Sequence, residues 1–507
     1  MQDSTVNHKR IAKNTVFLYI RMIVVMGIGL YTVRAILDLL GVVDYGIYNV
    51  VGGVVAMFSF VNGTLATSSQ RYFSIELAKG DLNRLNKWFC LNITVFSVFI
   101  LIFVVIAESI GLWFVNTQMT IPPERMSAAN CVYQFSILSF CISFISIPYN
   151  ALIIAHERMS AFAYISIIEA LMKLGIVFVL MYISWDKLIT YSILMLITSI
   201  SITLSYVVYC HRKFIESKFA LYWDKSEIRE LLSFSGWHLF GTFSVVVRSQ
   251  GINILINMFF NPAINAARAI AYQIYGAVTQ FSENFLVAVK PQIYKGYAQN
   301  DYIALNKLII RSTYLCTFLM AILVFPILAN SSFVLELWLK EVPNYAIAFT
   351  QLVLINGIID SASGPLTVSI LATGRIRKYE LTVATLFILN LPLSYIFLKL
   401  GAEPTTTMLV SIFISLVVFF ARAYILSKKL NLPLSKYFII FLRITFGLIV
   451  IWVSIYYTIY DTAYSFLTLV YQSIIVVILT TLVYTMFVFD KNDVKYIFSL
   501  IKSKIKK

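Results

Sequence analysis

The chain has 507 residues, of which 60% are hydrophobic and only 13% are charged. This balance excludes an ordinary soluble domain, because such domains carry far more charged and polar residues. The net charge of +16 would suggest nucleic-acid binding in a soluble protein, but in a membrane protein its distribution between loops is the informative quantity. The composition therefore predicts a single membrane domain, with membrane lipids rather than nucleic acid as its surroundings.

Apolar stretches of about 20 residues recur along the whole chain, and each is long enough to cross a hydrocarbon core of about 30 Å as a helix. The first, about 15–37, is too long for the apolar part of a signal peptide and lacks a small-residue cleavage site after it, so we expect it to remain as a span. The pattern predicts an all-α polytopic protein with roughly 14 spans. They begin near Thr15, Tyr45, Trp88, Met126, Phe162, Leu188, Leu232, Ala266, Leu308, Tyr345, Glu380, Thr406, Tyr437 and Tyr464.

Basic residues indicate the orientation of these spans. With the N-terminus in the cytoplasm, most of the 40 Lys and Arg residues fall in cytoplasmic segments, and the opposite orientation would violate the positive-inside rule. Both termini are then cytoplasmic. The longest cytoplasmic loops, 212–230 and 290–307, combine charged and aromatic residues, which predicts amphipathic helices at the membrane surface. The basic segment 490–507 predicts a further surface helix.

A weak internal repeat suggests how the spans are grouped. Leu85-Asn86-Lys87 reappears as Leu305-Asn306-Lys307; residue numbers 85 and 305 differ by 220, and the same shift aligns the second span with the eighth. We therefore expect an N-lobe at 1–220 and a C-lobe at 221–430, each of six spans. Residues 431–507 would add two spans and a basic cytoplasmic tail. Parallel repeats of this kind place a substrate cavity between the lobes.

Polar side chains within the spans need a reason, because an ionisable group in the membrane costs several kcal/mol unless it is paired or hydrated. In the seventh span, Arg248 is followed by Gln250, Asn253 and Asn257 at spacings that place the amides on one helical face. Such a face lines water or joins helices through hydrogen bonds, and both interpretations stay open.

The eighth span carries two neighbouring rows of polar side chains, each with spacings of seven and four residues. Aromatic and amide groups of this kind suit sugar hydroxyls, and helix packing with Glu283 paired to an arginine or held neutral is the alternative. The rows are Tyr272, Thr279 and Glu283, and Gln273, Gln280 and Asn284.

Charged residues in other spans allow two interpretations as well. Glu169 and Lys173 have the spacing of an ion pair within one helix. Arg21, Arg34 and Arg268 are either interfacial anchors or, with Arg248, a cationic site for a pyrophosphate, since guanidinium groups match phosphate oxygens and stay protonated. The acidic residues Glu108, Glu169, Glu283 and Asp360 in spans keep the overall sign bias slight.

Enzymatic and metal-dependent functions find little support. The five cysteines and four histidines show no ligand spacing, so we expect no metal and no cofactor. No glycine-rich phosphate loop ending in Lys-Ser or Lys-Thr occurs, which disfavours nucleotide-driven transport. The longest periplasmic segments, 116–125 and 330–344, lack the acidic pair or histidine that a glycosyltransferase or polymerase needs.

The segment Leu40-Gly41-Val42-Val43-Asp44-Tyr45-Gly46-Ile47-Tyr48-Asn49 resembles a signature of the polysaccharide flippases of the MATE-related MOP superfamily, the O-antigen and capsule type. The resemblance covers essentially the whole chain. It implies two six-helix lobes in a V with two added helices, in the bacterial inner membrane. The implied activity is translocation of a polyprenyl-pyrophosphate-linked oligosaccharide to the periplasmic leaflet by alternating access during surface polysaccharide biosynthesis, with a polymerase and glycosyltransferases as partners.

The resemblance also implies a cavity lined by cations, for which Arg21, Arg34, Arg248 and Arg268 are the candidates here, together with Tyr272, Gln273 and Glu283 as substrate-binding residues. Coupling to a proton or sodium gradient is open, with Glu108, Glu283 and Asp360 as the carboxylates to test. The alternative function is a MATE-type cation-coupled multidrug exporter. That function should need a cavity dominated by carboxylates, and binding of cationic dyes would distinguish the two.

Overall fold

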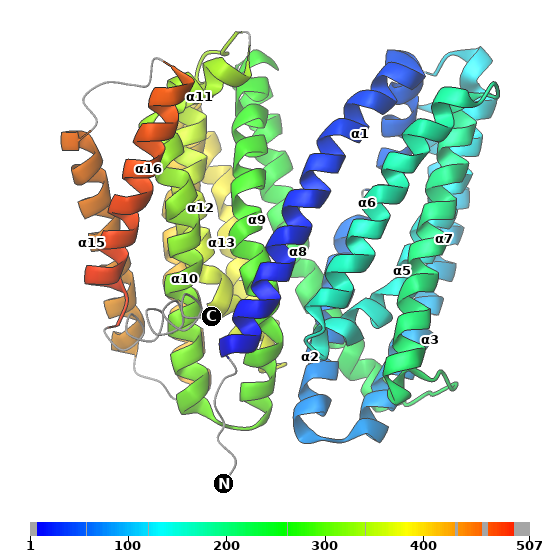
Figure 1. Ribbon diagram of the computed structural model, residues 1–507, viewed down its shortest axis with the longest axis horizontal. Coiled ribbons are helices and arrows are strands. Elements are labelled where there is room, and N and C mark those ends of the chain that lie inside the picture. The colour runs from blue at the N-terminus through cyan, green and yellow to red at the C-terminus, as the bar shows by residue number, and fades with distance from the viewer. Residues whose placement is uncertain are drawn as a thin grey trace, which may run out of the picture. The chain divides into compact units, whose positions relative to one another are not determined.

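The computed structural model describes residues 8–56, 58–119, 121–260, 262–339, 341–430, 434–458 and 465–490. This part of the chain is helical and contains no strand, as the apolar stretches predict (Figure 1). Four short turns interrupt or join the helices: η1 (Ala107–Gly111), η2 (Pro123–Arg125), η3 (Ile215–Ser217) and η4 (Tyr484–Val488). The helices are α1 (His8–Ala56), α2 (Ser59–Lys79), α3 (Leu82–Ile106), α4 (Leu112–Thr117), α5 (Met126–Ala155), α6 (Met159–Tyr182), α7 (Lys187–Lys213), α8 (Lys225–Phe259), α9 (Pro262–Ala298), α10 (Tyr302–Ala329), α11 (Ser331–Trp338), α12 (Ala346–Ala372), α13 (Arg377–Lys399), α14 (Thr406–Leu430), α15 (Leu434–Thr458) and α16 (Phe466–Val483).

Twelve helical segments in the described residues are long and apolar enough to cross a membrane. The predicted spans that begin near Tyr45 and Ala266 are not among them, although both segments are helical. The first is divided between the end of α1 and α2, and the second lies in α9; both are rich in hydroxyl, amide and charged side chains. They are the pair that the shift of 220 residues aligns. In each half, the predicted span that is too polar to be counted is therefore the second one in chain order. A polar helix of this kind commonly lines a cavity.

The described helices form two compact units that divide within α8, one ending at Leu239 and the other beginning at Phe240. In the first, the N-unit, α1 packs on α5 and α6, α2 packs on α3 and α5, and α7 packs on α5 and α6. Aromatic rings fill its interior: Tyr72 stacks on Trp88 with ring centroids 4.0 Å apart, and both are almost completely buried. Rigid apolar packing of this kind fixes the polar faces of the same helices.

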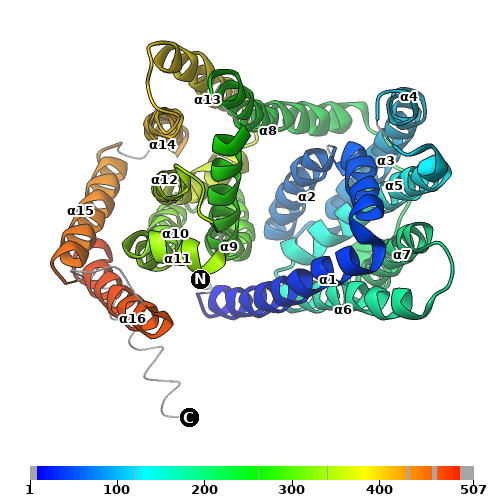
Figure 2. The same ribbon diagram turned by 90° about the horizontal axis from the view of Figure 1, so that it is seen from above.

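The second unit, the C-unit, repeats these neighbours. Helix α9 packs on α10 and α12, α12 packs on α10 and α14, and α13 packs on α14, which are the relations of α2, α3, α5, α6 and α7 in the N-unit. Helices α15 and α16 pack on each other and on α10 (Figure 2). The shared order supports the predicted repeat, while the three-part division at residues 220 and 430 stays a prediction.

A break in α1 lies at Gly41, which has φ 77° and ψ 167°. Because an L side chain is strained at that φ, glycine is the residue that permits the kink. Gly52 and Gly53, further along α1, are helical. The break therefore lies one residue into the segment Leu40–Asn49 and redirects the rest of it.

The two long loops predicted to form amphipathic surface helices contain, besides the short turn η3, only the ends of α7 and α9 and the starts of α8 and α10. Residues 290–298 continue α9, and α10 begins at Tyr302 after a turn in which Asn300 has φ 58°. Between α7 and α8 the described chain has only the short turn η3. Asn86 of α3 donates to the carbonyls of Glu216 and Lys218, both at 2.7 Å, so this linker satisfies its polar backbone without a helix of its own. Residues 491–507, the predicted basic tail, lie outside the described residues.

Candidate functional site

In the N-unit, α1, α5, α6 and α7 enclose a polar pocket of about 320 Å³. Arg21, Glu169 and Lys173 line it, and serine, threonine, asparagine and tyrosine side chains make up most of the remaining wall. Lys173 donates to Glu169 over 2.7 Å, which confirms the pair predicted from their spacing. With that pair neutralised, the pocket retains the positive charge of Arg21.

Arg21 lies over the ring of Phe162, with the guanidinium carbon 4.4 Å from the ring centroid. Its Nε atom is buried and has no hydrogen-bond partner among the described residues. A buried donor without an acceptor costs free energy of about 1–3 kcal/mol, and more for a charged group. Arg21 is therefore placed to gain from an anionic ligand, which is the role that the resemblance implies.

The C-unit brings together three of the predicted site residues, Arg248 of α8 with Arg268 and Tyr272 of α9. Only 3% of Arg268 is exposed, and its Nη1 donates to Oδ1 of Asn253. The guanidinium carbon lies 4.5 Å from the centroid of the Tyr272 ring. Although Tyr272 is adjacent, Nε and Nη2 of Arg268 are buried and have no partner in hydrogen-bonding geometry in the described part of the chain.

Arg248 lies 4.5 Å over the ring of Phe387, and its buried Nη1 likewise has no hydrogen-bond partner among the residues described. Asn253 also donates to Oε1 of Gln250 over 3.1 Å, so two of the three amides predicted for this face are connected. The two arginines repel each other electrostatically. An anion beside them would relieve both the repulsion and the unsatisfied donors.

Other predicted residues of the C-unit have different surroundings. Gln273 and Glu283 of α9 are exposed. The opposite charge that acts on Glu283 is Lys290, on its own helix, rather than an arginine. Asp360 of α12 accepts a hydrogen bond of 2.8 Å from Asn356.

Two predicted residues lie in the N-unit away from the Arg21 pocket. Arg34 is exposed on α1. Glu108 is exposed in η1, a π-helical turn, and accepts a hydrogen bond of 3.1 Å from Gln134. Neither residue lines the Arg21 pocket.

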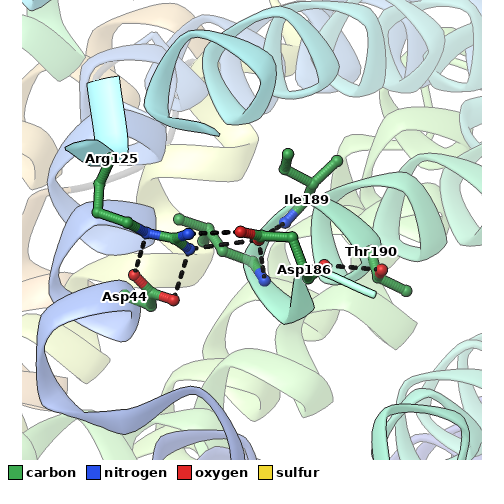
Figure 3. A network of polar contacts seen from close by, with 6 residues as sticks. Asp44, Arg125, Asp186, Ile189 and Thr190 are labelled. Atoms are coloured by element: carbon green, nitrogen blue, oxygen red, sulfur yellow. Dashed lines mark hydrogen bonds and ion pairs between the residues drawn. The ribbon is translucent and has the colours of Figure 1, made fainter. Parts of the chain in front are cut away.

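The structure also contains an ionic network that the sequence analysis missed (Figure 3). Arg125 lies between two carboxylates: its Nε and Nη2 donate to Asp44 over 2.9 and 2.6 Å, and its Nη1 and Nη2 bind Asp186. Asp186 also accepts from the backbone N–H groups of Leu188 and Ile189, which caps α7. The network fastens the segment after the Gly41 kink to the starts of α5 and α7. In the sequence, the residue that could have pointed to this network is Asp44, the acidic position of the Leu40–Asn49 segment.

The hydrogen bonds from Arg125 hold the pKa of Asp186 below its usual range, with the backbone donors adding to the effect. No three His, Cys, Asp or Glu side chains in the described residues lie close enough to hold a metal ion. Around Arg21, and around Arg248 and Arg268, most polar groups are cationic donors, hydroxyls and amides, and the Glu169 carboxylate is paired with Lys173. Such groups suit an organic or phosphate ligand.

Comparisons with known proteins agree with this architecture. Among solved structures, a MATE protein carrying a single substitution has a TM-score of 0.72 at 12% identity, covering 86% of this chain and all of its own. An outward-facing multidrug resistance MATE transporter of the MOP superfamily has a TM-score of 0.71 at 12% identity, covering 84% of this chain and 99% of its own. A MOP superfamily transporter from Pyrococcus furiosus, described as having a binding pocket of reverse polarity, has a TM-score of 0.66 at 11% identity, covering 85% of this chain and all of its own.

A search of curated proteins found no match. The model of the polysaccharide biosynthesis protein family matches residues 11–296, more than half of the chain. Because the sequence identities are low, the structural matches show the fold alone. The family match shows to which family the chain belongs. This multi-pass membrane protein therefore belongs to the polysaccharide biosynthesis protein family and has the MATE-like fold of MOP superfamily transporters.

Proposed function

We propose that the protein is a flippase that moves a polyprenyl-pyrophosphate-linked oligosaccharide from the cytoplasmic to the periplasmic leaflet. The observation that carries this proposal is the set of three intramembrane arginines, Arg21, Arg248 and Arg268, each with a buried guanidinium nitrogen that has no partner among the described residues. Such donors favour a diphosphate, whose oxygens accept several hydrogen bonds at once. Membership of a polysaccharide biosynthesis family supports a saccharide on the other side of that diphosphate.

The alternative, export of a cationic drug, fits these surroundings less well. A cation would meet two repelling arginines in the C-unit and the uncompensated charge of Arg21 in the N-unit. The Pyrococcus furiosus transporter is described as having a pocket of reverse polarity, so the MATE-like fold is compatible with either sign of charge. An enzymatic function has no support from the family or the fold, which are those of transporters.

The proposed mechanism is alternating access in the inner membrane, with both termini in the cytoplasm. Headgroup and sugars would enter a cavity open to the cytoplasm while the lipid tail stays in the bilayer, and the lobes would then rock outward. The substrate promotes this change only by binding the two states with different affinity. A proton or sodium gradient is the proposed drive, with Glu108, Glu283 and Asp360 as its carboxylates; the polymerase and glycosyltransferases of the same pathway are the proposed partners.

The test is the amount of lipid-linked oligosaccharide retained on the inner leaflet of the host. Four strains are compared: the deletion, the complemented deletion, and complementation with Arg248→Ala or with Arg84→Ala, which removes an exposed arginine at the start of α3. We expect accumulation and loss of surface glycan in the deletion and the Arg248→Ala strain only. Unchanged lipid-linked oligosaccharide in the deletion would refute the flippase and favour the drug exporter, which binding of cationic dyes would then show.

A further inference from the structure

A second cavity in the N-unit, of about 360 Å³, lies where α1, α5 and α7 meet. Its size is within the range of small-molecule sites, about 300–1,000 Å³. We call it the hydroxyl pocket, because no charged side chain lines it and its polar groups are Tyr48, Asn49 and four serines, Ser136, Ser139, Ser192 and Ser199. Phe135 and Phe140 provide aromatic surface in the same wall.

The serines of this pocket differ in their hydrogen bonding. Ser192 and Ser199 donate to carbonyls of their own helix, Ile189 at 2.7 Å and Met195 at 3.1 Å, as serines in membrane helices commonly do. Ser136 and Ser139 of α5 have no such bond and no other partner among the described residues. Their hydroxyls remain available to a ligand, as both donors and acceptors.

The glycines on the opposite wall leave the space open. A Cβ atom built on Gly53 would meet nothing within 4 Å, and one on Gly52 would meet only Oγ of Ser136, at 3.8 Å. Helix packing therefore does not require glycine at either position. A side chain at either position would extend into the pocket, so the two glycines leave room for a ligand beside the backbone of α1.

The hydroxyl pocket adjoins the Arg21 pocket, since Met195 and Ser199 line both. A neutral compartment with aromatic rings, hydroxyls and an amide thus adjoins a compartment of net positive charge. A pyranose ring matches the first, with apolar C–H faces for the rings and a rim of hydroxyl groups. A phosphate on its anomeric carbon matches the second.

From this arrangement we propose that the N-unit binds the first sugar of the lipid-linked glycan, a neutral pyranose in the hydroxyl pocket, with its anomeric phosphate against Arg21. The proposal rests on the proposed function and names the part of the substrate that this unit recognises. It assigns binding roles to Tyr48, Asn49, Ser136 and Ser139, beside the cationic role of Arg21.

The experiment measures dissociation constants by saturation-transfer NMR on the purified full-length protein in detergent. The probes are glucose 1-phosphate, galactose 1-phosphate, N-acetylglucosamine 1-phosphate and inorganic phosphate. For the unsubstituted protein, at least one sugar phosphate should bind about tenfold more tightly than inorganic phosphate, which corresponds to about 1.4 kcal/mol. Gly53→Leu, which fills the hydroxyl pocket, should remove this advantage and leave phosphate binding intact.

Gly175→Leu on α6 is the matched control, because a Cβ there also meets nothing within 4 Å and Gly175 lines neither pocket. Arg21→Gln should weaken binding of all four probes, and the melting temperature of each variant confirms that it is folded. Equal affinity of sugar phosphates and phosphate in the unsubstituted protein would overturn the inference, as would an undiminished advantage in Gly53→Leu. Neither result decides whether the protein is a flippase, which the leaflet assay tests separately. Failure of this inference can therefore be distinguished from failure of the proposed function.

Discussion

Arg268 is a charged side chain that other groups of the C-unit bury almost completely, with only one donor group of its guanidinium used by Asn253. Burying a charge without full pairing lowers the free energy of unfolding. Residues kept at such a cost are commonly those that bind a ligand, because the ligand supplies the missing acceptors. The same argument applies to Arg21 and Arg248, which are less buried than Arg268.

The variant Arg268→Gln distinguishes a role of Arg268 in substrate binding from a role in packing. Transport measured by surface glycan should fall at least about tenfold, since hydrogen bonds to charged groups contribute about 1.5–3 kcal/mol each. The melting temperature in detergent should stay the same or rise, because an unsatisfied buried charge is removed. A fall in melting temperature together with transport would instead assign Arg268 a structural role. Arg212→Ala, at an exposed position near the end of α7, should change neither quantity.

At the scale of elements, the ten-residue segment Leu40–Asn49 contains a helix kink, a partner of an ionic network and two residues of the hydroxyl pocket. Gly41 supplies the kink of α1, and Asp44 binds Arg125 directly after it. Tyr48 and Asn49, one turn further on, line the hydroxyl pocket, and the Tyr48 ring packs against Tyr191 of α7 with centroids 4.6 Å apart. The kink and the ionic network thus determine where the pocket residues point.

Removing Arg125 should loosen this element in a pH-dependent way. The side chains of Arg125, Asp44 and Asp186 are 27%, 21% and 31% exposed, so Arg125→Ala should lower the free energy of unfolding by about 1–2 kcal/mol at pH 7, between the values for exposed and buried pairs. The pKa of Asp186 is depressed, so its contribution is present above the unfolded pKa of about 3.9 and is lost as the pH falls through the lower folded pKa.

Thermal unfolding of both proteins between pH 7 and pH 2 measures this effect. The difference in melting temperature should be constant from pH 7 to about pH 5 and should shrink below about pH 4. A difference that persists unchanged at pH 2 would mean that Arg125 stabilises the fold through packing rather than through its charge. Arg212→Ala serves again as the exposed arginine control.

At the scale of the whole molecule, the predicted orientation gives a direct experiment. In a variant with the five cysteines replaced by serine, Trp185→Cys lies between α6 and α7 and Gln299→Cys lies between α9 and α10. Both positions are exposed. A membrane-impermeant maleimide should label the first in intact cells and the second only after permeabilisation, because the positive-inside rule places basic loops in the cytoplasm. The reverse pattern would contradict the predicted topology.

The sequence by itself determined the fold class and the succession of most spans. Lipid requires long apolar helices whose backbone groups are satisfied internally, and that requirement is local enough to read from windows of about 20 residues. It also identified arginines in the membrane, since a charge there is conspicuous in any apolar window. Gly41 and Asp44 were named in the signature segment, but no local pattern showed that one bends the helix and the other binds Arg125.

Only the tertiary structure decided which polar groups meet. Asp44 binds Arg125, which lies 81 residues further along the chain, and Arg125 in turn binds Asp186. The hydroxyl pocket combines residues of α1, α5 and α7, and its serines look like ordinary packing residues in the sequence. Whether a serine hydroxyl bonds its own helix or faces a cavity depends on the register in which helices pack, and that register is fixed by long-range contacts between buried aromatic and aliphatic side chains.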